Sequence, residues 1–236
     1  MKIVSWNCHY GLDELKAKAL WDEYPNADIF VIQECKRTDI DAFKYEWKFK
    51  NWYGDDLEYS DLGVAVFSKS HKIEFIDEFN RNFRYVVPYK VITNNEFALL
   101  AVWTKPVPYE YDDNVVKAVE SYKKKNLLGG NVVIIGDFNT GYNEVNDENR
   151  KRYPDLVKKL NGYKNASSDK PEEFEKTFFF DRNRKGYIND FCFISENFNG
   201  KDIKFNPNTD WKKNDFEQER WRGLSDHCPI SVEFDF

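Results

Sequence analysis

Near the end of the chain, Asp226 and His227 place an acid beside an imidazole directly before an apolar segment. Ile230, Val232 and Phe234 alternate with polar residues there, a pattern typical of a half-buried strand. Because successive side chains of a strand point to opposite faces, a regular strand could present only one of the pair to a common site. We therefore expect Asp226 and His227 to lie in a turn that leads into the strand.

Carboxylates and carboxamides also follow other apolar segments of the chain. These residues are Asn7 after IVSW, Glu34 after IFVIQ, and Asp137 and Asn139 after VVIIG. Asp190 differs because it lies inside an apolar segment, YINDFCFI, where an ionised group is costly unless another group pairs with it. Ends of buried strands are where open α/β folds assemble their sites, so we expect these side chains to converge.

Each of these side chains also has a local interpretation that involves no site. The asparagines and Asp137 can form turns, and Glu34 can cap the helix that follows it. Asp226 can cap a turn, and His227 can be an ordinary surface imidazole. A shared site is the one interpretation that covers them all, because converging carboxylates repel one another unless a cation lies among them. Carboxylate oxygens prefer hard ions such as Mg²⁺ or Mn²⁺, and amides with an imidazole donate to anions, so the set favours phosphate-ester hydrolysis.

A zinc site is a second interpretation of the histidines and cysteines. Cys8 is adjacent to His9, and His227 is adjacent to Cys228. Adjacent pairs lack the spacing that is usual for zinc ligands, so this alternative is the weaker one. The four cysteines also lack the spacing of a disulfide scaffold, and we expect them to be reduced.

Composition restricts the class of protein. The 236 residues are expected to form one domain, 1–236, with 17% aromatic residues that suit strand-rich layers. A formal net charge of −6 argues against general binding to polyanions, although basic residues gather at 122–126 and 181–186. The N-terminal apolar run is too short for a signal peptide, and no stretch approaches the length of a membrane span. We expect a cytoplasmic protein without membrane association and without an obligate protein partner.

The periodicity of apolar residues predicts alternating strands and helices. Three helices are expected. The first spans 12–24, the second is short and directly follows the strand that ends at Glu34, and the third spans 112–126. In the first helix we expect Leu12, Leu15, Ala19 and Trp21 to face inward. The sequence TNNE at 93–96 is typical of a hairpin turn, and so is the polar segment 181–186. Strands are expected at 2–6, 27–34, 47–53, 63–69, 72–77, 84–92, 97–104, 131–139, 176–180, 187–195 and 230–235. This order predicts an α/β chain in which helices cover two sheets of a layered sandwich.

The chain resembles the endonuclease/exonuclease/phosphatase superfamily, which includes the DNase I-like and abasic-site nucleases. The resemblance extends from Ile3 to Phe234 and rests on WN followed by GL, IQE, GVAVFSK, GDFN, NDFCFIS and SDHCPI, in that order. It implies a DNase I-like, four-layered α/β sandwich of two mostly antiparallel sheets packed face to face, with helices on the outside. It also implies a Mg²⁺ or Mn²⁺ cofactor.

The resemblance implies a role for each matching residue. The metal glutamate falls on Glu34, with Asp226 as a further metal ligand. The aspartate that positions or deprotonates water falls on Asp137, and the catalytic histidine falls on His227, oriented by Asp190. The phosphate-contacting residues are Asn7, Asn139 and His227, to which we add Trp103, His9, Arg84, Arg182 and Arg184.

Divalent-metal-dependent hydrolysis of phosphodiester bonds is the expected activity, most simply that of a nuclease with DNA or RNA as its substrate. A phosphatase or phosphodiesterase for inositol phosphates, phospholipids or other small esters is the alternative, and a catalytically inactive binding module is a third class. The sequence departs from the family pattern at Trp103, where many members have tyrosine or histidine. Tyr187 and Asn189 differ from the tryptophan-rich pocket of abasic-site enzymes.

Overall fold

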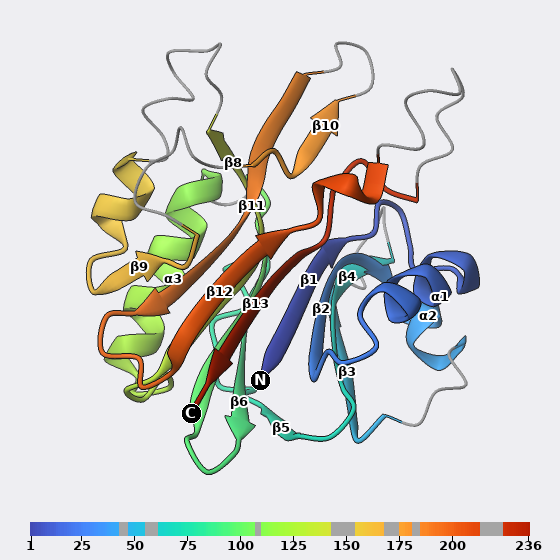
Figure 1. Cartoon of the computed structure of the whole chain (residues 1–236). Helices are drawn as coiled ribbons and strands as arrows, with labels where there is room; N and C mark the ends of the chain where they lie inside the picture. The colour runs from blue at the N-terminus through green and yellow to red at the C-terminus, as the bar shows by residue number, and fades with distance from the viewer. Residues whose placement is uncertain are drawn as a thin grey trace.

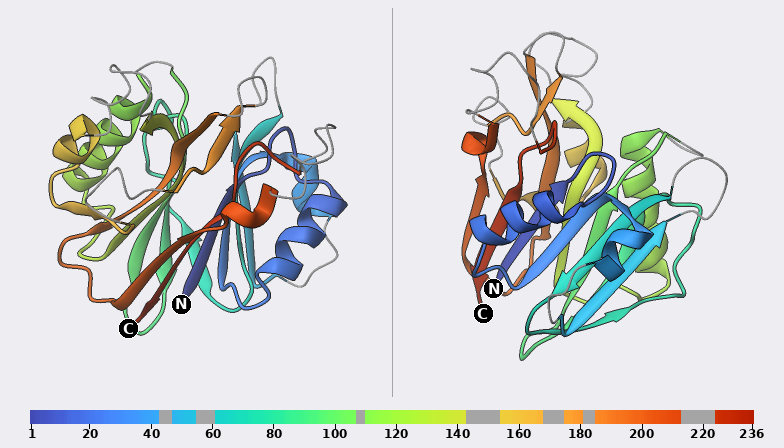
Figure 2. Two further views of the ribbon diagram at one scale, coloured as in Figure 1. Left: turned by 45° about the horizontal axis from the view of Figure 1, so that its top comes forward. Right: turned by 90° about the vertical axis from the view of Figure 1, so that its right-hand side faces the viewer.

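Two β-sheets lie face to face in the computed structural model of the chain, and helices cover their outer faces (Figure 1, Figure 2). The structure describes residues 1–42, 47–54, 61–106, 110–142, 154–167, 175–180, 185–212 and 224–236. The predicted segment 181–186 therefore lies largely outside the described residues, and Arg182 and Arg184 lie entirely outside them.

The first sheet contains both the first and the last strand of the chain. Its spatial order is β12 (Lys201–Pro207), β13 (Ile230–Asp235), β1 (Lys2–Asn7), β2 (Ile29–Lys36), β4 (Leu62–Ser68) and β3 (Phe49–Gly54). β1 and β2 run parallel, and the other described neighbours in this sheet pair antiparallel. β3 consequently forms one edge of the sheet.

The second sheet is built around the longest strands. Its order is β10 (Phe178–Phe180), β11 (Lys185–Ser195), β8 (Val132–Tyr142), β7 (Phe97–Trp103), β6 (Val86–Ile92) and β5 (Lys72–Phe75), with β9 (Tyr163–Asn165) paired to β11. β7 and β8 run parallel, and the remaining described pairs are antiparallel. Two mostly antiparallel sheets were predicted, and the structure confirms them.

The two faces of the first sheet contribute to different apolar cores. Ile3 packs in the large core shared with the second sheet, whereas Val4 and Trp6 pack against the helical layer on the other side. That layer contains α1 (Glu14–Glu23) and α2 (Arg37–Ala42). α3 (Tyr111–Lys124) and a helix at 154–159 cover the outer face of the second sheet, and a short 3₁₀ helix, Thr209–Lys212, follows β12 (Figure 1). The predicted four-layered sandwich is therefore confirmed.

The predicted inward face of the first helix is confirmed at Trp21 and wrong at Leu15. Leu15 is 69% exposed, and the buried residues of α1 are Ala17, Leu20 and Trp21. Asp13 caps the helix by accepting a hydrogen bond from the backbone N–H of Lys16, so Leu12 precedes the helix. Leu12 is still buried, but it does not set the helical phase.

Four described elements were missing from the prediction: β9, β12, the helix at 154–159 and the short 3₁₀ helix Thr209–Lys212. β12 is an edge strand in which Ile203 and Phe205 are only partly buried. Its remaining side chains are mostly polar, so the sequence has too weak an apolar alternation to predict a strand. Among the described residues, none of the helices is both long enough and apolar enough to cross a membrane.

Parallel pairing brings the polar strand ends to one side of the sandwich. Asn7 lies opposite Gln33 in the β1–β2 register, and Trp103 lies opposite Asp137 in the β7–β8 register. The C-terminal ends of β1, β2 and β8 all point to the upper side of the molecule in Figure 1. The predicted convergence of strand ends therefore follows from the topology of the two sheets.

Gly136 lets β8 approach β7 closely just before Asp137. Its φ is +149°, and a Cβ atom at this position would lie 2.0 Å from the backbone oxygen of Val102. An L-residue is strained at this φ, and the clash is with backbone that cannot move without disturbing the sheet.

Replacing Gly136 by alanine should lower the free energy of unfolding by about 2–4 kcal/mol, because the cost of backbone strain at this φ adds to the cost of the clash with Val102. Gly130→Ala is the matched control, because a Cβ there meets no atom within 4 Å. Urea denaturation of both variants measures the difference. Equal midpoints for the two variants would show that the close approach of β7 and β8 is not a constraint.

Candidate active site

The carboxylate of Asp137 is the centre of a hydrogen-bonded cluster on β8, which continues past its predicted end to Tyr142. Asp137 is fully buried, and its Oδ1 accepts the backbone N–H of Asn139 at 2.8 Å. Its Oδ2 accepts the side-chain amides of Asn7 at 2.9 Å and Asn139 at 3.0 Å. Three donors on a buried carboxylate fix its orientation, so the structure brings together three of the predicted site residues.

Glu34 joins the cluster through a bulge in β2. The strand runs two residues beyond its predicted end, and the register with β4 shifts between Gln33 and Cys35. Glu34 has a φ of +56°, and a bulge of this kind redirects a side chain. Its Oε1 accepts the Asn7 amide at 3.1 Å, and its Oε2 accepts the backbone N–H of Tyr10 at 3.1 Å. A single amide, that of Asn7, therefore bridges the carboxylates of Glu34 and Asp137.

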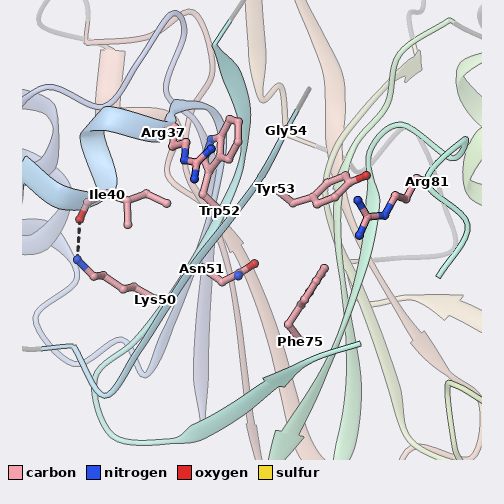
Figure 3. A pocket seen from close by; sticks show the side chains of 9 residues that line it. All are labelled: Arg37, Ile40, Lys50, Asn51, Trp52, Tyr53, Gly54, Phe75 and Arg81. Carbon is pink, nitrogen blue, oxygen red and sulfur yellow. Dashed lines mark hydrogen bonds between the residues drawn. The ribbon is translucent and has the colours of Figure 1, made fainter. Parts of the chain in front are cut away.

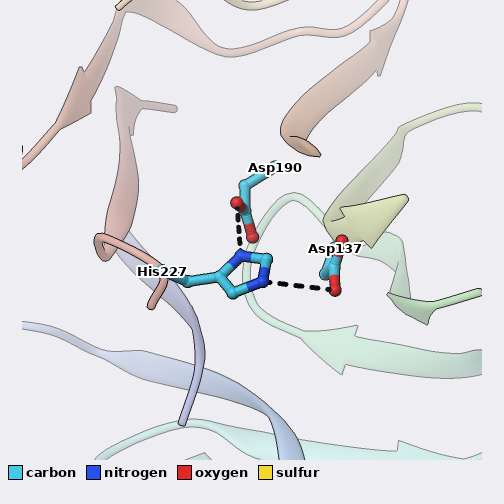
Figure 4. A group of neighbouring side chains, drawn as sticks. All are labelled: Asp137, Asp190 and His227. Atoms are coloured by element: carbon cyan, nitrogen blue, oxygen red, sulfur yellow. Dashed lines mark hydrogen bonds and ion pairs between the residues drawn. The ribbon is translucent and has the colours of Figure 1, made fainter. Parts of the chain in front are cut away.

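His227 is held between two aspartates (Figure 4). Its Nδ1 lies 2.9 Å from Oδ2 of Asp190, and its Nε2 lies 3.9 Å from Oδ2 of Asp137. Asp190 and Asp137 are partners in the antiparallel register of β11 and β8. The ring of Phe178 lies against the imidazole, with centroids 4.7 Å apart. The predicted pairing of Asp190 with His227 is therefore present in the structure.

Backbone contacts fix the turn that carries His227. The indole N–H of Trp6 donates to the His227 carbonyl at 3.0 Å, and the His227 N–H donates to the hydroxyl of Ser225. That hydroxyl in turn donates to the carbonyl of Asn7 at 2.6 Å. The predicted turn before β13 is thus tied to the end of β1, which also carries the bridging amide.

Burial and charge act in opposite directions on the two central groups. Burial disfavours the protonated imidazole of His227, but the carboxylates of Asp190 and Asp137 outweigh it and raise its pKa to about 9. Burial raises the pKa of Asp137 to about 7, although His227 and the amide donors lower it. The imidazolium and the carboxylates therefore stabilise one another in this buried cluster.

Asp226 and His9 lie together next to this cluster. The Nδ1 of His9 is 3.2 Å from Oδ1 of Asp226, and both side chains are partly exposed. The neighbouring His227 is buried, so the predicted turn leaves Asp226 more exposed than His227. Metal ligation by Asp226 and phosphate contact by His9 remain predictions.

Trp103 is buried beneath other side chains. Its indole stacks on Tyr85, with centroids 5.2 Å apart, and the ammonium group of Lys105 lies 3.5 Å from the centroid of the Trp103 ring. Arg84 is half-buried, and its backbone carbonyl accepts the N–H of Lys105 at 3.0 Å. Phosphate contacts of Trp103 and Arg84 remain predictions.

Lys105 is a candidate that the sequence interpretation missed. Burial lowers its pKa more than the nearby carboxylates of Glu34 and Asp137 raise it. The sequence contained a signal for Lys105, because this residue follows an apolar segment, as the other polar site residues follow apolar segments of their own. The sequence interpretation considered acids, amides and histidines at strand ends, and therefore passed over a cation.

The donor set fits a hard divalent cation better than zinc. Glu34 is only half-buried, and a carboxylate that accepts two hydrogen bonds retains lone pairs for a metal. One ligand atom each of Asp137, Asp190 and His227 lie within 4.8 Å of one another, but the imidazole nitrogen Nδ1 is already bonded to Asp190. Metal binding by Glu34 remains a prediction. Burial raises the pKa of the Cys8 thiol, and this disfavours the zinc alternative.

Comparison with known proteins gives one family and one fold. The sequence profile of the Endonuclease/Exonuclease/phosphatase family matches residues 4–227. No curated protein matches the chain in sequence. A 3′-5′ exonuclease (NExo) from Neisseria meningitidis is 19% identical, with a TM-score of 0.67 and complete coverage of both chains.

Two other solved structures have the same fold. D. rerio TDP2, complexed with single-strand DNA product, is 15% identical with a TM-score of 0.64, and the match covers 100% of this chain and 99% of that one. An AP endonuclease from Archaeoglobus fulgidus is 16% identical with a TM-score of 0.64, and both chains are covered completely.

The Asp190–His227 contact predicts strongly non-additive mutational effects. Asp190→Asn and His227→Ala should each reduce phosphodiester turnover by roughly 10²–10⁴-fold, because either change removes the oriented imidazolium. The double variant should lose little more than either single variant. Turnover of a small chromogenic phosphodiester, normalised to the folded fraction, measures the cycle. Losses that multiply would mean that the two residues act separately.

Proposed function

The chain belongs to the endonuclease/exonuclease/phosphatase family, and we propose on that premise that it is a divalent-metal-dependent nuclease. The proposed catalytic unit is a single domain formed by residues 1–236. The observation that carries the proposal is the amide of Asn7, which hydrogen-bonds to Glu34 and to Asp137 at once. A metal-holding carboxylate and a proton-accepting carboxylate are thereby kept at a fixed separation, as hydrolysis of a phosphodiester requires.

Glu34 would hold Mg²⁺ or Mn²⁺, with Asp226 as a second ligand. When bound, such an ion supplies Lewis-acid neutralisation of the phosphate and of the leaving oxygen. Both oxygens of Glu34 accept N–H donors, which hold the carboxylate in one orientation. The protein's own contribution is therefore a preoriented oxygen ligand at the end of the sandwich.

Asp137 would hold the attacking water and accept its proton. Its carboxylate is oriented by the amides of Asn7 and Asn139, so the water can be aligned for in-line attack. The Asn139 amide also donates to the carbonyl of Thr104 at 3.1 Å, which ties the end of β8 to the end of β7. Such bonds between strands limit movement of the base.

His227 would donate a hydrogen bond from Nε2 to a non-bridging phosphate oxygen. Nδ1 is engaged by Asp190, which selects the orientation of the ring and favours its protonated form. A cationic donor aimed at the phosphate stabilises the charge that gathers there in the transition state. Lys105 would add a second positive charge to the site, because its ammonium lies within the field of Glu34 and Asp137.

An exposed aromatic residue beside Glu34 supports a nucleic-acid substrate. Tyr10 is 70% exposed, and its backbone N–H donates to Glu34. The ring of His9 makes an edge contact with the ring of Tyr10 at a centroid distance of 4.4 Å. Exposed aromatic faces stack on bases, and the similar D. rerio TDP2 structure contains single-strand DNA product. The net charge of −6 is the observation that favours a small phosphate ester instead.

A substrate panel tests the proposal. We expect cleavage of DNA or RNA in Mg²⁺ and none in excess EDTA, because the proposed ligands are oxygens. The panel also contains abasic DNA and inositol phosphates. Faster hydrolysis of an inositol phosphate, or full turnover in the chelator, would contradict a metal-dependent nuclease.

Glu34→Gln should raise the Mg²⁺ concentration for half-maximal activity by at least about tenfold, because a carboxamide is a weaker ligand than a carboxylate. The free energy of unfolding should change by less than about 1 kcal/mol, since glutamine keeps the shape and one acceptor oxygen. Glu120→Gln on the exposed face of α3 is the matched control. If Glu34→Gln unfolds the protein while its folded fraction keeps full activity, Glu34 is structural.

A further inference from the structure

A groove of about 440 Å³ lies at the β3 edge of the first sheet (Figure 3), and its described lining includes none of the candidate active-site residues. Its lining includes three cationic side chains, Arg37, Lys50 and Arg81, and three aromatic rings. The described residues that line it include no carboxylate. The described part of the lining therefore presents cationic side chains in a chain whose net charge is −6.

The cations reach the groove from three different elements. Arg37 begins α2, Lys50 lies on β3, and Arg81 lies in the segment between β5 and β6. Arg81 pairs with Asp77 at 2.7 Å, but both side chains are about two-thirds exposed, so the pair contributes little and can exchange for another anion. The ammonium of Lys50 donates to the carbonyl of Ile40 at 3.3 Å, which directs it along the groove.

Trp52 forms a rigid wall of the groove. Its indole N–H donates to the carbonyl of Cys35 at 2.7 Å. A Cβ atom on Gly54 would lie 2.3 Å from the Trp52 ring, and one on Gly63 would lie 2.7 Å from it. Only glycine therefore fits at these two positions, and the indole packs directly on the backbone of β3 and β4.

The groove is linked to the candidate metal site by the short chain segment from Glu34 to Arg37. Cys35, to which Trp52 is bonded, directly follows Glu34, and Arg37 is three residues beyond Glu34. Three residues span at most about 10 Å, so the first cation of the groove lies within a few nucleotide lengths of the proposed metal ligand.

We propose that this groove binds the backbone phosphates of the nucleic-acid segment that flanks the scissile bond, as a second subsite of the enzyme. The inference rests on the proposed nuclease function and adds the length of substrate that the protein recognises. Dispersed cations with partly exposed aromatic rings are suited to a single strand, which presents both phosphates and bases.

An acidic polypeptide that adds to the free edge of β3 is the competing occupant. Strand addition uses the backbone of an edge, whereas the charges here lie on side chains of three separate elements. The three-residue separation of Glu34 and Arg37 also favours the substrate over a separate partner.

The test compares steady-state kinetics on a 16-nucleotide single strand and on a dinucleotide. The variant Arg37→Gln, Lys50→Gln, Arg81→Gln removes three charges from the groove, and Lys124→Gln, Lys164→Gln, Lys201→Gln removes three exposed charges elsewhere. The groove variant should raise KM for the long strand about tenfold and lower its preference over the dinucleotide. Its log–log salt slope should fall by about 2, because each single-strand phosphate contact contributes about 0.7. The control variant should match the unaltered protein.

Each outcome bears on one inference or both. A long-strand KM and salt slope equal to those of the unaltered protein would overturn the groove subsite while leaving the nuclease function intact. Failure of the unaltered chain to cleave any polynucleotide would overturn both. Competition by polyglutamate as effective as that by an oligonucleotide of equal charge would assign the groove to acidic polypeptides. The double variant Lys50→Gln, Arg81→Gln repeats the test without altering the start of α2.

Discussion

The amide of Asn7 is the interaction on which the candidate site depends. Its two N–H bonds go to two carboxylates, one on the β2 bulge and one on β8, so it joins the two sheets at their polar end. Carboxylates brought this close repel one another, and burial increases the cost. Three kinds of group can compensate for this repulsion: amide donors, the His227 imidazole and a divalent cation. The surrounding residues position the amides and the imidazole. The backbone carbonyl of Asn7 is itself held by Ser225, which connects the same residue to the turn of His227.

The backbone around this amide adopts conformations that other parts of the fold avoid. Among the described residues other than glycine, six have positive φ, and His9, Tyr10, Glu34 and Asn139 are four of them. Such conformations are unfavourable for side chains with a Cβ, and they persist where surrounding bonds determine them. Here the determining bonds are the Asn139 and Tyr10 N–H groups to the site carboxylates. The strain therefore lies in the residues that present the polar groups.

Charge is distributed unevenly over the molecule. The candidate active site gathers four carboxylates, on Glu34, Asp137, Asp190 and Asp226, while the groove beside β3 gathers cations. A polyanion approaching the acidic end is repelled unless a metal ion is bound there, and a neighbouring cationic surface offsets that repulsion over about one Debye length. With the proposed subsite in the groove, a chain of net charge −6 would offer a surface suited to a nucleic acid.

Local patterns in the sequence predicted the class of fold, most strands of both sheets and the polar residues of the candidate site. Apolar alternation is a local property, and the motifs around Asp137 and His227 are contiguous, so both can be read along the chain. The sequence by itself did not determine β12, whose stability comes from pairing with β13, or the inward face of α1, whose phase is set by the Asp13 cap. It also did not determine the bulge at Glu34, the placement of Lys105 near Glu34 and Asp137 or the groove at β3, because each depends on residues distant in sequence. Only tertiary packing decides such contacts, since it selects which side chains share one buried space.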